Sequence, residues 1–138
     1  VSSDLNLPMD GKLAKTATSQ PLWLCHGADA SAWEALGAKS FPTNLLDGGV
    51  DVVQAMRQLS QAGLTRVFCE GGGQLAASLM RAGLVDELVM FQGPKLIGGN
   101  GLSALGDLGV EKLGQAPKLD SIEQRQIGDD VMQRWRLV

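Results

Sequence analysis

The chain has 138 residues, a formal net charge of −3 and a composition of 44% hydrophobic and 20% charged residues. This length and balance predict one globular domain with a buried core, and they exclude a disordered or fibrous chain. The 12 basic residues are scattered, which argues against nucleic-acid binding because that function needs clustered Lys and Arg. No stretch approaches the roughly 20 apolar residues of a membrane span. Since no charged-then-apolar leader opens the sequence, we expect a cytoplasmic protein without a membrane partner.

Short elements are predicted in the first third of the chain. The apolar run "PLWLC" (21–25) predicts a buried strand. Residues 29–37 form a brief helical pattern in which Asp29 or Ser31 could cap the start. A second short strand is expected at 43–47, directly before a turn.

From Asp51 the hydrophobic period becomes helical and ends at Gly63. The segment "TRVFCE" (65–70) then predicts a strand from its β-branched and aromatic residues. A second helix follows the glycines and ends at Gly83, and 85–91 predicts another strand. Alternating helices and strands with short connections indicate an α/β layer with parallel pairing.

The C-terminal part has a different pattern. Residues 93–109 are Gly-rich and without clear period, so they are expected to form a loop. Residues 119–127 and 131–138 flank a Gly-Asp-Asp turn signal and predict an antiparallel hairpin. In its last strand Val131, Trp135 and Leu137 alternate with Met132, Arg134 and Arg136, which predicts one buried face.

The unit Glu70-Gly71-Gly72-Gly73 carries the strongest local signal. Glycines between a strand and a helix let backbone N–H groups approach a ligand, and the helix start favours a phosphate group. Glu70 could accept hydrogen bonds from a polar substrate. A tight turn with a solvated acid is the competing interpretation, and the local pattern alone leaves both open.

Other candidate residues carry less chemistry. His26 is the single histidine, which favours a structural role over a metal site, and no metal is predicted. The pair Asp86-Glu87 could act as a general acid or base, but a solvated helix–strand junction is the favoured interpretation. Cys25 and Cys69 lie in apolar runs and indicate buried thiols in a reducing compartment.

Larger motifs resemble one enzyme family. The segment "VFCEGGGQLAASLMRAGLVDELVMFQGPKLIGGNG" (67–101) is similar to the reductase domain of bacterial bifunctional riboflavin-biosynthesis proteins. The opening "SSDLNLPMDGKL" (2–13) and the closing "IGDDVMQRWRLV" resemble segments of the same domain. The resemblance therefore extends over nearly the whole chain.

This resemblance implies a fold, a cofactor and a substrate. The fold would be dihydrofolate-reductase-like: a mixed, mainly parallel sheet flanked by helices, with a C-terminal antiparallel hairpin. NADPH would reduce 5-amino-6-(5-phosphoribosylamino)uracil, a phosphoribosylated aminopyrimidine, to its ribitylamino product. The protein would be a homodimer whose parent chain carries a fused deaminase domain.

The resemblance also assigns residues. Glu70 matches an acid that contacts the substrate, and the Gly71–Gly72 peptide is expected to be strained or cis. The proton donor has no counterpart among the matched residues, so no catalytic residue is predicted. The residues that match NADPH-binding positions are Ser3, Gly71, Gly72, Gly73, Gln74, Leu75, Ala76, Ala77 and Ser78.

Residues 1–138 are expected to be the C-terminal major part of a reductase domain, whose N-terminal portion and deaminase domain lie outside this chain. The piece alone would then hold half of a site and be inactive. Two alternatives remain at this stage. One is a reductase of the same fold that acts on a pterin, and the other is a catalytically silent ligand-binding or oligomerisation module.

Overall fold

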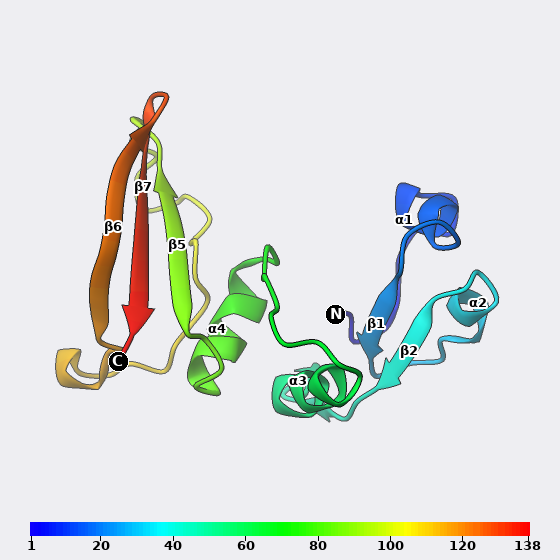
Figure 1. Cartoon of the computed structure of the whole chain (residues 1–138). Helices are drawn as coiled ribbons and strands as arrows, with labels where there is room; N and C mark the ends of the chain where they lie inside the picture. Colours follow the sequence, from blue (N-terminus) through cyan, green and yellow to red (C-terminus); the bar gives the residue numbers. More distant parts are fainter. The chain divides into compact units, whose positions relative to one another are not determined.

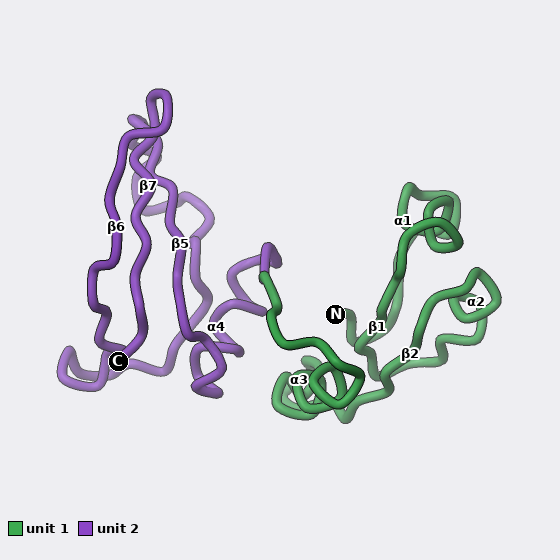
Figure 2. The backbone as a smooth tube through the Cα atoms, in the orientation of Figure 1, with its two compact units in different colours: residues 1–68 green, residues 69–138 purple.

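The computed structural model describes residues Val1 to Val138, which fall into two units, Val1–Phe68 and Cys69–Val138 (Figure 2). The elements of unit 1 are α1 (Lys12–Thr16), β1 (Trp23–His26), α2 (Ser31–Glu34), β2 (Lys39–Pro42), β3 (Leu45–Leu46), β4 (Gly49–Val50) and α3 (Val52–Gln61). Unit 2 contains α4 (Gly73–Arg81), β5 (Glu87–Gln92), a 3-10 turn (Leu113–Gln115), β6 (Leu119–Ile127) and β7 (Asp130–Leu137) (Figure 1). No helix combines the length and the apolar character needed to cross a membrane.

Unit 1 is a small β–α–β arrangement. Strands β1 and β2 pair in parallel with Trp23 opposite Lys39, and α2 lies in the connection between them. Parallel neighbours need such a crossover because the chain must return to the same end of the sheet. Trp33 of α2 is 2% exposed and packs in a cluster with Leu24 of β1. Trp33 is therefore part of the core of unit 1.

The two predicted helices of unit 1 form, with clear start signals. Asp29 accepts hydrogen bonds at 3.0 Å from both the backbone N–H and the hydroxyl of Ser31, and these bonds hold the pKa of Asp29 below its usual 3.8. Asp51 caps α3 by accepting from the N–H groups of Val53 and Gln54, each at 3.0 Å. The Asp51 cap satisfies donors that a helix start would otherwise leave unpaired, whereas the N-cap residue of α2 is Ala30, so the prediction that Asp29 or Ser31 caps this helix is wrong.

Two features of unit 1 were missed by the sequence patterns. The strand that pairs with β1 is β2 at 39–42, whereas 43–47 was the predicted strand. Within 43–47 only Leu45–Leu46 is a strand, and it pairs with β4 across a two-residue turn at Asp47-Gly48. Helix α1 was not predicted either, because its five residues are too short to show a period.

The predicted strand at 65–70 is absent. Residues 65–71 make no backbone hydrogen bond and are exposed, and Phe68 is 78% exposed. High β-propensity shows that a segment suits a pleated surface, but a strand forms only when a neighbour supplies hydrogen-bond partners.

Unit 2 is built on an antiparallel sheet in the order β5-β7-β6. The predicted hairpin is confirmed: Ile127 pairs with Asp130 across Gly128-Asp129. Strand β5 pairs with β7 in antiparallel register. Parallel pairing is limited to β1 with β2 and one isolated bridge between Ser2 and His26, so the expected mainly parallel character is not found. The reason is that β5 pairs with β7 of the hairpin, while residues 65–70, which were expected to form a strand of the same sheet, stay unpaired.

Neither face of β7 is wholly buried, because Met132 shares its side of the strand with the exposed Arg136. Met132 is 5% exposed, whereas Val131, Trp135 and Leu137 are half-buried. Only Ala77 and Met132 of unit 2 are buried hydrophobic residues. Unit 2 is therefore held mainly by backbone pairing, and a large part of its apolar surface is exposed.

Candidate functional site

Glu70 and the glycines after it lie at the start of unit 2. Glu70 is exposed and makes no hydrogen bond or ion pair, so its carboxylate is available to a ligand. The expectation of a strained or cis peptide at Gly71–Gly72 is wrong: the structure contains no cis bond, and Gly72 has ordinary angles of φ −59° and ψ 168°.

The first turn of α4 has unsatisfied donors. Gly72 is its N-cap residue and supplies no side-chain cap, and the first intrahelical bond runs from Ala76 N–H to the Gly72 carbonyl at 3.2 Å. The N–H groups of Gly73, Gln74 and Leu75 have no hydrogen-bond partner. Free donors and the partial positive end of a helix together favour an anionic ligand at this turn.

The loop 101–107 packs against this first turn. The N–H of Gly106 donates to the carbonyl of Gly73 at 2.9 Å. A Cβ atom at Gly73 would lie 2.8 Å from the carbonyl oxygen of Ala104, and one at Gly106 would lie 2.7 Å from the Gln74 side-chain oxygen. Only glycine fits at position 73, because the backbone of Ala104 comes closer than a methyl group allows, whereas at position 106 the contact is with the flexible Gln74 side chain, which can move aside.

A hollow of about 400 Å³ lies between the helix start and this loop. Its lining is mostly glycine and leucine with few polar side chains: Gly73, Gln74, Gly101, Leu102, Ser103, Leu105, Gly106 and Asp107. We call it the α4 hollow. Backbone donors at one wall and apolar side chains at the other suit a ligand with a phosphate group and an apolar part.

The other predicted cofactor residues lie farther along α4. Leu75 and Ala76 are half-buried, Ala77 is fully buried, and the hydroxyl of Ser78 lies 3.2 Å from an Arg81 guanidinium nitrogen. Of the predicted set, Gly73 and Gln74 border the α4 hollow. The burial of Ala77 gives its side chain a packing role.

Ser3 belongs to unit 1. It is half-buried, and its hydroxyl donates to the carbonyl of Gly48 at 3.2 Å. A contact of Ser3 with a cofactor stays a prediction.

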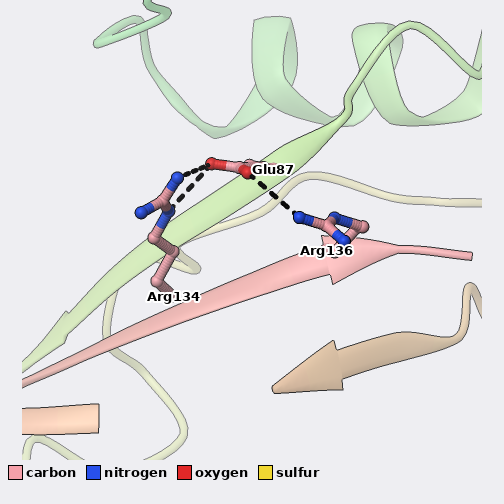
Figure 3. A network of polar contacts seen from close by, with 3 residues as sticks. All are labelled: Glu87, Arg134 and Arg136. Atoms are coloured by element: carbon pink, nitrogen blue, oxygen red, sulfur yellow. Dashed lines mark hydrogen bonds and ion pairs between the residues drawn. The ribbon is translucent and has the colours of Figure 1, made fainter. Parts of the chain in front are cut away.

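The carboxylate of Glu87 takes part in a surface ion-pair network on β5 and β7 (Figure 3). Its Oε2 lies 2.6 Å from Arg134 Nη2 and 2.8 Å from Arg134 Nε, and its Oε1 lies 3.9 Å from Arg136 Nη2. A second hollow of about 480 Å³ is lined by Glu87 and Arg136, the residues just before β5 and the chain end. Glu87 thus has a structural ion-pair role, in agreement with the solvated junction that was the favoured interpretation.

His26 lies in the core of unit 1. It is 2% exposed, and its Nε2 is 2.7 Å from the Ser40 hydroxyl, which supports the structural role favoured by the sequence. Cys25 is buried, but Cys69 is exposed, so the expectation that both thiols are buried is wrong for Cys69. No group of three or more His, Cys, Asp or Glu residues could hold a metal ion.

Sequence patterns missed loop 101–107 as a part of the site, and they missed its contact with Arg81. The loop was predicted only as irregular, because its contacts with α4 lie about 30 residues away in the sequence. The available signal was the pair Gly101 and Gly106, since glycines in a loop can mark a close backbone approach.

The fold has counterparts among solved structures. A RibD structure from Acinetobacter baumannii matches with a TM-score of 0.78 and 18% identity, covering 99% of this chain and 36% of that one. The riboflavin biosynthesis reductase Rib7 of Saccharomyces cerevisiae matches with a TM-score of 0.73 and 18% identity, covering 99% and 67%. The fold is therefore the expected α/β, dihydrofolate-reductase-like one.

Sequence comparison identifies the family. The family model "RibD C-terminal domain" matches residues 1–133, and the chain belongs to this family. The riboflavin biosynthesis protein RibD of Escherichia coli is 39% identical over 84 residues, which is 61% of this chain and 23% of that protein. RibD of Haemophilus influenzae is 33% identical over 117 residues, covering 83% and 30%.

A shorter relative is named for its reaction. The 2,5-diamino-6-ribosylamino-4(3H)-pyrimidinone 5′-phosphate reductase of Methanothermobacter thermautotrophicus is 30% identical over 84 residues, covering 60% of this chain and 39% of that protein. The matched region thus spans about a quarter to two fifths of these relatives. Riboflavin-biosynthesis reductases are the class of relatives that the chain resembles.

Proposed function

We propose that this chain is part of an NADPH-dependent reductase that converts 5-amino-6-(5-phosphoribosylamino)uracil to its ribitylamino product in riboflavin biosynthesis. The observation that carries the proposal is the uncapped first turn of α4, closed by loop 101–107, in a chain of the RibD C-terminal domain family. Residues 1–138 are then the major C-terminal part of the reductase domain, and a deaminase domain is fused in the parent protein.

The α4 hollow fits the phosphate-bearing part of a nicotinamide dinucleotide. Gly73 and Gln74 would hold a phosphate through their free N–H groups, and the absence of a Cβ at Gly73 permits the close approach of loop 101–107. When bound, NADPH supplies the hydride, and the protein orients and encloses the reactants. The remaining residues of the proposed cofactor set are Ser3, Gly71, Gly72, Leu75, Ala76, Ala77 and Ser78.

Glu70 is proposed to anchor the substrate. Its exposed carboxylate has no protein partner and directly precedes the glycines of the cofactor turn. A carboxylate accepts hydrogen bonds from the N–H and O–H groups that an aminopyrimidine ribose phosphate carries. This role is one of binding, and no residue is assigned as the proton donor.

A direct test uses the whole protein with calorimetry and an absorbance assay. NADPH is expected to bind with heat, with NADH binding more weakly, and NADPH absorbance is expected to fall only when the ribosylaminopyrimidine is added. A pterin substrate in the same assay separates the alternative reductase. Absence of NADPH binding by the folded whole protein would refute the proposal.

A homodimer is proposed from the exposed apolar surface of unit 2. Strand β5 is at the edge of its sheet, and Phe91 is 62% exposed, Met90 41% and Val89 39%. Exposed apolar residues on an edge strand favour pairing with a second copy. Sedimentation equilibrium should show a dimer that Phe91→Glu weakens at least tenfold, while Gln92→Glu adds the same charge and leaves it intact. A monomeric wild-type protein would contradict the proposal.

We also place the protein in the cytoplasm. Both cysteines are free thiols, which suits a reducing compartment.

A further inference from the structure

Arg81 connects α4 to the loop that closes the α4 hollow. Its guanidinium donates through Nη1 to the carbonyl oxygen of Asp107 and lies, through Nη2, 3.2 Å from the hydroxyl of Ser78. Arg81 is exposed and forms no ion pair with any carboxylate. Both groups that Arg81 bonds are uncharged. The contact therefore depends on where these groups lie and not on attraction between opposite charges.

Helix geometry explains how Arg81 reaches the loop. Side chains of a helix tilt toward its N-terminus, so Arg81 extends back over Ser78, three residues earlier. Asp107 follows Gly106, whose N–H bonds to the Gly73 carbonyl at the opposite end of α4. The loop is thus attached to both ends of α4. Its backbone bonds to Gly73, the first residue of the helix, and the side chain of Arg81, the last residue of the helix, bonds to the loop.

Arg81 bonds to the backbone of the loop and not to the Asp107 side chain. The Asp107 carboxylate is used within the loop, where its Oδ1 accepts from the N–H of Gly109 at 2.8 Å. Arg81 bonds to the carbonyl of the same residue. The planar guanidinium has several donors in fixed directions, so it can bond the Asp107 carbonyl and the Ser78 hydroxyl at the same time.

We propose that Arg81 is a positioning residue of the α4 hollow: it holds loop 101–107 against the first turn of α4 and thereby sets the affinity for the dinucleotide. The effect on affinity rests on the proposed function, whereas the effect on the loop does not. Without Arg81 a ligand would have to order the loop on binding, which reduces affinity without changing the reacting groups. The signature is a weaker binding constant at unchanged turnover.

The test compares Arg81→Gln with Arg57→Gln in the whole protein. Arg57 is exposed on α3 in unit 1 and makes no ion pair or hydrogen bond through its side chain, so its replacement removes the same charge alone. Hydrogen exchange over residues 101–109 should become about tenfold faster in Arg81→Gln, about the effect of one hydrogen bond from a charged donor (~1.4 kcal/mol). The NADPH dissociation constant should rise about tenfold as well, with kcat at saturating NADPH unchanged.

Arg81→Lys separates positioning from simple charge attraction. Lysine keeps the charge but lacks the planar fork, so we expect loop exchange to stay fast and affinity to recover only in part. Full recovery of affinity with a fast-exchanging loop would overturn the proposal and indicate that Arg81 attracts the ligand by its charge.

Two further outcomes are decisive. Equal loop exchange in Arg81→Gln and Arg57→Gln would overturn the positioning role. A loop that depends on Arg81 in a wild-type protein that binds no NADPH would support the positioning role and refute the proposed function.

Discussion

Replacing Gly73 by alanine tests directly whether loop 101–107 packs on α4. The added Cβ would lie 2.8 Å from the carbonyl oxygen of Ala104 and 3.2 Å from the N–H nitrogen of Gly106. Ordinary contacts to carbon are about 3.5–4.0 Å, and both neighbours are backbone atoms that cannot rotate away. The loop must therefore move, and the hydrogen bond from Gly106 to Gly73 lengthens or breaks.

The matched control is Gly72→Ala. A Cβ at Gly72 meets no atom within 4 Å, and the backbone angles there are open to alanine. Loss of the glycine N-cap lowers the stability of Gly72→Ala, and reduced freedom of the unfolded chain raises it. The net change in the free energy of unfolding should therefore stay within about 0.5 kcal/mol. Overpacking at Gly73 lowers the free energy of unfolding by about 1–3 kcal/mol. Alanine forms helix better than glycine does, which offsets part of this loss. The difference between the two variants should be about 1–2 kcal/mol.

Hydrogen exchange and urea unfolding measure this difference. The amide of Gly106 should exchange roughly 5–30-fold faster in Gly73→Ala than in Gly72→Ala, as that energy implies. The midpoint of urea unfolding, followed by a signal from unit 2, should be lower in Gly73→Ala than in Gly72→Ala. Equal exchange rates and midpoints in the two variants would refute the close approach of the loop to α4.

Two further predictions concern binding and pH. Glu70→Gln should raise the dissociation constant of the pyrimidine substrate about tenfold and leave that of NADPH within twofold, because a neutral amide accepts weaker hydrogen bonds; titration calorimetry with each ligand checks this, and an equal loss for both ligands would contradict the anchoring role. Burial raises the pKa of the Cys25 thiol above its usual 9.0, so the folded chain keeps this proton when the unfolded chain loses it. The thiol should then leave the free energy of unfolding unaffected below pH 9 and lower it above pH 9, and this fall should be less steep in Cys25→Ala. A thiol reagent should label Cys69 first because Cys69 is exposed. The same alkaline slope in both forms would contradict the buried thiol.

Segments with strong local signals were predictable. Helix α3 starts at the capping Asp51 and stops before Gly63, which has a φ of 98° that disfavours other residues. The hairpin β6–β7 turns at Gly128-Asp129 as its turn chemistry indicates. These features depend on neighbours in the sequence, so the chain can show them without its fold.

Pairing between distant segments was not predictable in the same way. The composition of 65–70 favours a strand as strongly as that of 85–91, yet only the latter has a partner, in β7. Likewise, the alternation in β7 predicts burial of Val131, Trp135 and Leu137, but these residues are only half-buried, and the one buried residue of the strand is Met132 on the other side. Such choices depend on which surface is covered, and the residues that cover it lie elsewhere in the chain.

The sequence by itself determined the family resemblance, the start of α3 at Asp51, the hairpin and the position of a glycine turn that suits phosphate. These are read from local chemistry and from motifs whose residues are adjacent. Only the tertiary structure decided that loop 101–107 closes that turn, that Gly73 must lack a Cβ, and that Arg81 bonds to the loop carbonyl of Asp107. The physical reason is that each of these contacts joins residues 25 or more positions apart, so no periodicity or spacing in the sequence records them.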